Sequence, residues 1–225
     1  MKKDFPKKIP INGRVRICVE MVKKQKVTDN IVVNIGSSFG WLEKEIQILK
    51  PERLIGIEIN QEAVKFARQN VPGVGFLVGD ALDLPLESNL ADLAFLFDVL
   101  EHVPKGTEHQ ALKETNRVLK KGGILLLSTP NSHPVSNILD LAWYFGHRHY
   151  SKDKISKLLK KAGFKITYIE SKGNIFSSLY LTWFYICKIL FRINQPRNVF
   201  FEKVDDQGYK NQGITDIFLV AQKVK

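Results

Sequence analysis

Short apolar runs alternate with segments of helical periodicity along most of this 225-residue chain. Because each helix between two strands returns the chain to the same edge and covers one face, such alternation predicts a mostly parallel sheet. The composition is 44% hydrophobic and 25% charged, which allows a sizeable core without disulfide or metal staples. We therefore predict one α/β domain over residues 1–225. The predicted strands lie at residues 31–35, 54–58, 74–78, 93–97, 124–127, 164–169 and 214–220.

The net charge indicates which classes of partner this chain favours, and the cysteines indicate its redox compartment. A net charge of +11 favours nucleic acid, anionic lipid or a phosphorylated substrate, although a solvated lysine-rich surface explains it equally well. Cys18 and Cys187 are far apart, which indicates free thiols in a reducing compartment and no zinc site. No apolar run follows the basic residues 1–10, so we do not expect them to be a secretory signal. We expect a cytoplasmic protein whose residues 1–28 form a basic helical segment.

A glycine-containing loop follows the first predicted strand and precedes a helix that reaches about residue 49. Its sequence is Gly36-Ser37-Ser38-Phe39-Gly40. A loop that enters a helix at the carboxyl edge of a parallel sheet presents backbone N–H groups and the positive end of the helix dipole. Glycines there allow a ligand to approach the backbone closely. By itself the pattern also fits an ordinary tight turn.

Acidic residues end the second, third and fourth predicted strands. Glu58 lies eighteen residues after Gly40, and Asp80 and Asp98 follow the next two strands. A carboxylate at the position of Glu58 can accept hydrogen bonds from both hydroxyls of a ribose. A carboxylate beside an adenine ring can accept from its exocyclic amino group. The three acids together predict an adenosine-binding edge.

Residues 31–131 and 147–166 resemble a class I S-adenosylmethionine-dependent methyltransferase of the small-molecule and quinone-methylating kind, methyltransferase type 11. The resemblance implies a Rossmann-like three-layer sandwich whose seven-stranded, mostly parallel sheet has an antiparallel last strand. It also implies S-adenosylmethionine as cofactor. The matching pieces are VVNIGSSFG (32–40), GIEIN (56–60), VGDALDLP (78–85), ADLAFLFDVLEHV (91–103), RVLKKGGILLLSTPN (117–131) and HRHYSKDKISKLLKKAGFKI (147–166).

The resemblance assigns cofactor roles to matching positions. The glycine loop would hold the methionine end, the second strand the ribose, the third the adenine, and the fourth the methyl-transfer channel. Two departures predict weaker cofactor binding: Asn34 stands where the family has Asp, and Ser38 where it has Gly. A non-catalytic, cofactor-binding member is therefore one alternative. The implied cofactor-binding residues are Gly36, Ser37, Ser38, Gly40, Glu58, Ile59, Asp80, Ala81, Asp98 and Val99.

We predict methyl transfer to a small-molecule or lipid-like acceptor, with oxygen as the favoured acceptor atom. A hydroxyl acceptor benefits from a general base. His102, which follows the fourth strand, and His147 are the catalytic candidates, whereas His149 is expected to be a hydrogen-bonding loop residue. Asp98, Glu101 and His102 could ligate a divalent ion, but three such residues within five positions are insufficient grounds to assign a metal.

Two segments interrupt the regular alternation, and we expect residues 132–150 and 174–212 to be insertions on the substrate side or lids. Residues 175–193 are strongly apolar and near the length that spans a bilayer, but Lys188 and Arg192 argue against spanning. A helix in a membrane interface or over an apolar acceptor fits this pattern. A core or dimer-interface helix remains an alternative, and the oligomeric state is not predicted.

Rival functions share parts of this pattern. A nicotinamide dehydrogenase requires G-x-G-x-x-G, but Ser38 and Trp41 occupy the second and third glycine positions. The loop fits the G-x-S-x-G of a serine hydrolase, yet only about thirty residues precede it, too few for the earlier strands of that fold. Methylation of RNA or protein stays an alternative, although no N/D-P-P-aromatic motif follows the fourth strand, so nucleic acid is the less favoured acceptor.

Overall fold

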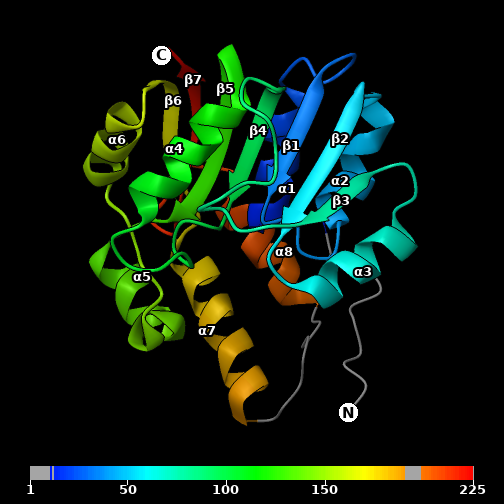
Figure 1. The fold of residues 1–225 in the computed structure, drawn as a ribbon. Coiled ribbons are helices and arrows are strands. Elements are labelled where there is room, and N and C mark those ends of the chain that lie inside the picture. The colour runs from blue at the N-terminus through cyan, green and yellow to red at the C-terminus, as the bar shows by residue number, and fades with distance from the viewer. Residues whose placement is uncertain (1–10, 12, 191–198, 225) are drawn as a thin grey trace.

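A computed structural model describes residue 11, residues 13–190 and residues 199–224 (Figure 1). Seven strands and the helices between them make up this part of the chain. The strands are β1 (Ile31–Ile35), β2 (Arg53–Glu58), β3 (Gly75–Val78), β4 (Ala91–Phe97), β5 (Leu119–Pro130), β6 (Phe164–Lys172) and β7 (Asp216–Lys223). The α-helices are α1 (Gly13–Lys23), α2 (Trp41–Ile46), α3 (Gln61–Asn70), α4 (Glu108–Val118), α5 (Pro134–Leu139), α6 (Lys152–Lys161), α7 (Ile175–Leu190) and α8 (Val199–Gly208), and the 3-10 helices are η1 (Gln47–Leu49) and η2 (Leu141–Phe145).

The seven strands form one sheet in the order β3-β2-β1-β4-β5-β7-β6. The first five strands in this order pair in parallel, whereas β7 is antiparallel to both β5 and β6. The predicted α/β sheet with an antiparallel last strand is confirmed. The direction of strand order reverses between β1 and β4, and parallel sheets bind ligands beyond the carboxyl ends of the strands at such a point.

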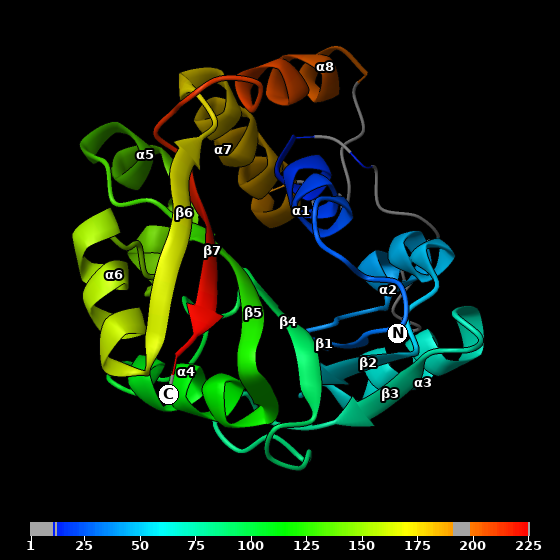
Figure 2. The same ribbon diagram turned by 90° about the horizontal axis from the view of Figure 1, so that it is seen from above.

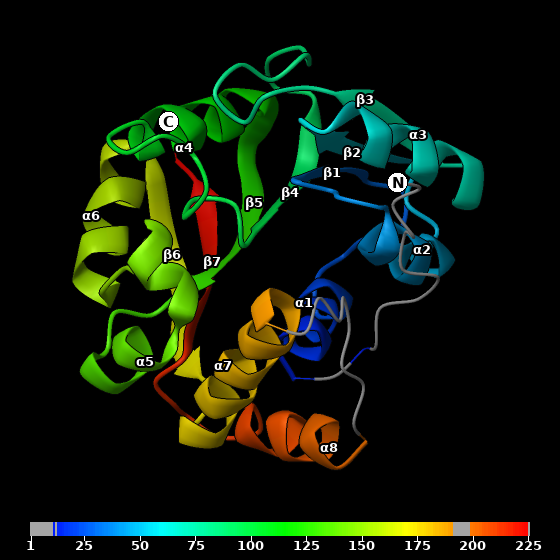
Figure 3. The same ribbon diagram turned by 90° about the horizontal axis from the view of Figure 1, so that it is seen from below.

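Helices cover both faces of the sheet (Figures 2 and 3). On one face α4 and α6 bury Ala111, Leu112 and Leu159 against β1, β4 and β5. On the other face α1 and α2 pack Val22 and Ile46 against the same central strands. The central strands are buried on both faces, which explains why they appear in the sequence as continuous apolar runs.

Local capping side chains start two helices, and one helix ends before the point that its local sequence favours. The side chain of Asn60 accepts hydrogen bonds at the start of α3, and Ser151 accepts one from the amide of Lys154 at the start of α6. The glycine pair Gly122-Gly123 is a local signal that favours a helix end there, but α4 already ends at Val118. Leu119 is fully buried and paired with Ala91, so burial in the sheet overrides the helical pattern.

Three helices surround the carboxyl edge of the sheet near the switch point. Of the basic segment predicted to be helical over residues 1–28, the part Gly13–Lys23 is helical as α1, and residues 1–10 and 12 lie outside the described part. Figure 3 shows α7 lying between α5 and α1. The apolar segment predicted over residues 175–193 is helical through Leu190, and its last three residues lie outside the described part. Within the described residues, none of the helices has both the length and the hydrophobicity required to cross a bilayer. Cys18 and Cys187 are buried free thiols, as expected.

Candidate functional site

The loop between β1 and α2 has a backbone conformation that favours glycine. Gly36 and Gly40 have φ angles of 82° and 77°, and a Cβ atom at Gly36 would overlap the side chain of Val99. Ser38 also adopts a left-handed conformation, with φ 48°. A serine is strained there, and glycine at this position would relieve the strain. The tight loop holds the end of β1 against the loop that follows β4.

The Glu58 carboxylate lies beside the glycine loop at the end of β2. Its two oxygens accept hydrogen bonds from the amides of Ser38 and Asn60, each at 2.9 Å. Each carboxylate oxygen has two acceptor positions, so Glu58 retains capacity for two further donors. Next to it the side chain of Ile59 is 68% exposed and offers an apolar surface to a ring. These features suit a ribose and an attached base.

Asn34 is paired with a buried acid that sequence reasoning missed. The Asn34 side-chain amide donates to Glu43 Oε1 at 2.8 Å, and Glu43 is fully buried in α2. Burial raises the pKa of Glu43 to about 7, although the hydrogen bond from Asn34 opposes the rise. An aspartate at position 34 would place a second carboxylate against Glu43. The amide therefore fits the buried acid, which gives a physical reason for the departure from the family pattern.

A cavity of about 370 Å³ lies between the glycine loop and α1. Its wall includes Gly36, Ser37, Trp41 and, from the end of β4, Asp98. Among the described residues, no hydrogen-bond partner exists for the buried Ser37 Oγ or Trp41 Nε1. Unpaired buried polar atoms are costly, so these two indicate a polar ligand in this cavity.

Asp98 stands at the boundary with a second cavity of about 330 Å³, because it lines both. It has φ 54°, and one oxygen accepts from Ser128 Oγ at 2.9 Å. The other oxygen lies 3.1 Å from Nε of Arg14, which extends from α1. Sequence analysis missed Arg14, because nothing in a basic helix shows which of its cations turns inward.

Histidines gather in the second cavity, where the rings of His102 and His147 are 4.8 Å apart between centroids. The buried Asp140 Oδ2 lies 3.3 Å from His147 Nδ1 and 2.8 Å from His149 Nε2. Burial alone would raise the pKa of Asp140, but the hydrogen bonds from both histidines hold it well below its usual value. His149 Nδ1 also contacts Asn137, at 2.7 Å, so both of its ring nitrogens are engaged in hydrogen bonds, as expected for this residue.

The structure brings most of the predicted site residues to one edge of the sheet. Asp80 and Ala81 lie beside β2 but line neither of the two cavities, and Asp80 caps its own turn by accepting from the amide of Leu82. Both predicted insertions contribute to the second cavity, through Asp140 and Tyr185 among others. Asp140 is a further residue that the sequence patterns did not single out.

Comparison with known proteins agrees with this geometry. A family model described as a methyltransferase domain matches residues 33–127, which include β1, the glycine loop, β2 and β4. Residues 33–127 are thus similar to a methyltransferase domain. A probable S-adenosylmethionine-dependent methyltransferase of Mycolicibacterium smegmatis is 32% identical over 115 residues, which are 51% of this chain and 44% of that protein.

Two further proteins are similar to this chain. One has an acceptor in its name, and the other is a solved structure that is similar over nearly the whole chain. A phthiotriol/phenolphthiotriol dimycocerosates methyltransferase of Mycobacterium ulcerans is 34% identical over 80 residues, 35% of this chain and 29% of that protein. The chain thus spans less than half of either relative. A putative methyltransferase solved in complex with the Trm112 activator of Haloferax volcanii has a TM-score of 0.69 at 17% identity, over 94% of this chain and 91% of that one. That likeness concerns the fold.

The similarity to methyltransferase domains implies S-adenosylmethionine as cofactor. The residues present fit that molecule. Glu58 has free acceptor capacity for ribose hydroxyls, and the exposed Ile59 can pack on a purine. Ser37 Oγ and Trp41 Nε1 are donors for the polar methionine end in the adjoining cavity. The side chain of Ser38 does not fill the cofactor cavity, because Ser38 lies in the wall of a cavity that still has a volume of about 370 Å³.

Proposed function

We propose that this chain transfers a methyl group from S-adenosylmethionine to an oxygen of a small-molecule or lipid-like acceptor. One observation carries the proposal: Asp98 lines both the cavity beside the glycine loop and the cavity that contains the histidines. Cofactor and acceptor would therefore meet at Asp98. The cofactor supplies a methyl group on a sulfonium, and the protein contributes mainly the alignment of the acceptor with the bond that breaks.

His102 and His147 are the proposed catalytic residues, because their rings face each other in the acceptor cavity. They would bind the acceptor oxygen and assist the loss of its proton. Asp140 holds the Nδ1 edge of His147, which leaves the Nε2 atom for the acceptor. The phthiotriol acceptor named for the relative from M. ulcerans is a further reason to test hydroxyl acceptors first.

The proposed activity is tested by incubating the protein with methyl-labelled S-adenosylmethionine and extracts of hydroxylated small molecules and lipids. We expect label in a product, and a loss of about 100-fold in turnover for His147→Ala, within the range for acid–base residues. The affinity for S-adenosylmethionine should not change in this variant. His109, which lies on α4 and lines neither cavity, provides the control His109→Ala. Tight cofactor binding without labelled product from any extract would instead support a non-catalytic cofactor-binding protein.

Exposed apolar side chains lie on η2 and on α7, which also lines the acceptor cavity through Tyr180, Leu181 and Tyr185. We propose that these exposed side chains contact a membrane surface. In η2 Phe145 is 81% exposed, and in α7 Phe176 and Trp183 are 56% and 43% exposed. Figure 1 shows α5 and α7 at the same end of the molecule. Large exposed apolar patches are typical of interaction sites. A lipid-like acceptor could enter the cavity from that side.

Vesicle binding tests the membrane contact. The double substitution Phe145→Ser with Phe176→Ser should weaken co-sedimentation with anionic phospholipid vesicles by about tenfold or more, because each phenylalanine contributes on the order of 1.5 kcal/mol when buried. Ile48, which is 76% exposed in η1, provides the matched control Ile48→Ser. Equal sedimentation of all three proteins would contradict the proposal.

A further inference from the structure

The Glu101 carboxylate lies in the acceptor cavity with one oxygen unused. Glu101 is only 2% exposed, and its Oε2 accepts from Thr129 Oγ1 at 3.2 Å. Within the described part of the chain, Oε1 has no hydrogen-bond partner. A buried, unpaired carboxylate oxygen calls for a cation or a donor that the protein itself does not provide.

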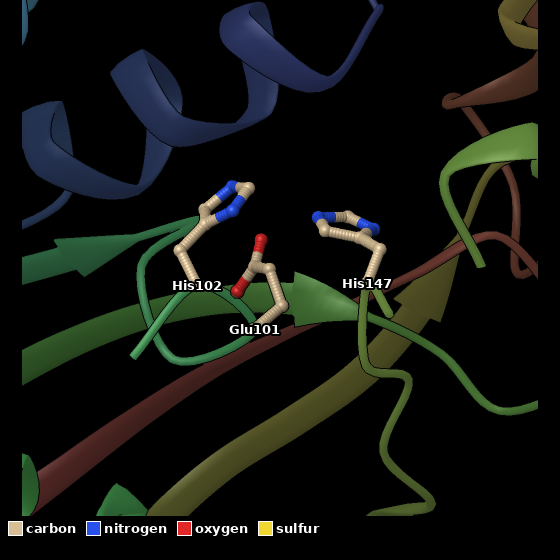
Figure 4. Close-up of side chains that lie close together, drawn as sticks. All are labelled: Glu101, His102 and His147. Atoms are coloured by element: carbon tan, nitrogen blue, oxygen red, sulfur yellow. The ribbon is translucent and has the colours of Figure 1, made fainter. Parts of the chain in front are cut away.

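Two imidazoles converge on this carboxylate. Figure 4 shows the Glu101 side chain directed into the space between the rings of His102 and His147. Ligand atoms of the three residues all lie within 4.8 Å of one another. Ligands about 2.1 Å from a tetrahedral metal ion are about 3.4 Å apart, so the side chains need to close by roughly 1 Å. His102 is exposed at the surface, so its imidazole has room to rotate toward the other two ligands.

We propose that Glu101, His102 and His147 bind one divalent transition-metal ion of the zinc type. Two imidazoles and a carboxylate suit zinc, cobalt or iron, whereas magnesium and calcium prefer oxygen ligands alone. Three protein ligands leave a coordination position open toward the cavity, the arrangement of catalytic sites. The proposal deepens the proposed function and rests on it in one respect: His102 and His147 would act on the acceptor through the ion, which would bind the acceptor oxygen and lower the pKa of its hydroxyl.

The surroundings of the three residues favour a cation. Of the described residues that line the cavity, Asp98, Glu101, Asp140, Asp205 and Asp216 carry carboxyl groups, and only Arg14 carries a guanidinium. This acidic wall lies in a chain with a net charge of +11. Asp140 also holds the Nδ1 atom of His147, as the outer carboxylates of metal-binding histidines do.

Asp98 and His149 are not included among the ligands. The charge of Asp98 is already paired with the guanidinium of Arg14. His149 uses one ring nitrogen for Asn137 and the other for Asp140. The sequence suggested Asp98, Glu101 and His102 by adjacency alone, whereas the fold replaces Asp98 by His147, which lies 45 residues after His102. Because that distance in sequence exceeds any local motif, only the tertiary structure reveals the set.

Cobalt(II) binding to the full chain, purified without a histidine tag, tests the site. We expect one equivalent to bind and to produce the visible d–d bands of a four- or five-coordinate centre. Glu101→Gln, which preserves shape, and His147→Ala should each weaken cobalt binding by at least about tenfold. His109→Ala is the control, because this imidazole lies outside the cavity. Circular dichroism of each variant verifies that it is folded.

Each outcome decides a separate question. Absence of the bands, or equal cobalt affinity in Glu101→Gln and the unchanged protein, would overturn the metal site. Labelled product that forms in the presence of a chelator would then show that methyl transfer proceeds without it. Cobalt binding that depends on Glu101 and His147, with no methyl transfer to any acceptor, would leave the metal site standing and reject the proposed function.

Discussion

Glu58→Ala is expected to weaken the binding of S-adenosylmethionine by about 100-fold. A hydrogen bond to a charged group contributes on the order of 1.5 kcal/mol or more, and Glu58 is positioned to accept two from a ribose. Calorimetric titration with the cofactor measures the loss. The same titration with NAD tests whether the adenosine site belongs to a nicotinamide enzyme, for which the loop lacks the required glycines.

Two comparisons separate the ribose contact from damage to the loop, because Glu58 also accepts from the amide of Ser38. Glu58→Gln keeps one oxygen acceptor and the shape, and we expect it to lose less affinity than the alanine variant. Glu87→Gln, at an exposed loop position, should bind as the unchanged protein does. Unaltered affinity in Glu58→Ala would show that the ribose lies elsewhere.

Glu43→Gln is expected to raise the free energy of unfolding by about 3 kcal/mol at pH 8, with little effect at pH 4.5. Burial raises the pKa of Glu43 from its ordinary value of 4.5 to about 7, so the folded chain holds this proton where the unfolded chain has lost it. The stabilising contribution is present below pH 4.5 and is lost as the pH rises through 7. Glutamine cannot ionise and still offers an oxygen to Asn34.

Urea unfolding at several pH values between 4.5 and 8 measures this effect. The unchanged protein should lose stability across that range, and the loss should be about 3 kcal/mol smaller in Glu43→Gln. Glu52→Gln replaces an exposed glutamate and provides the control. Parallel stability profiles for the unchanged protein and Glu43→Gln would show that the buried acid is ionised at neutral pH or paired with another group.

The same buried pair explains the unusual residue near the end of β1, Asn34. The departure at Asn34 suggested weaker cofactor binding, because an amide brings no charge. In the structure Asn34 serves a structural role, donating to Glu43 beneath the loop. If the unchanged protein binds S-adenosylmethionine without any loss of affinity, the hydrogen bond to Glu43 is sufficient to explain why residue 34 is asparagine.

Local sequence patterns were sufficient to predict the strands, the helix starts and the glycine loop, because each of these depends on residues that are close together in the chain. Runs of apolar residues fixed the strands of the sheet, because a strand buried on both faces tolerates few polar side chains. Asn60 and Ser151 marked helix starts, since an N-cap acts within three residues. The glycine loop and Glu58 were identified for the same reason: strand, turn and helix follow one another directly.

Only the tertiary structure decided which distant side chains share a cavity. Arg14 reaches Asp98 across 84 positions, and His147 faces His102 across 45. Each contact depends on the path of a connecting segment and on the packing of α1 or η2, which no periodicity in the chain encodes. The end of α4 at Val118 has the same cause, because burial of Leu119 in the sheet outweighed the local signal of two glycines.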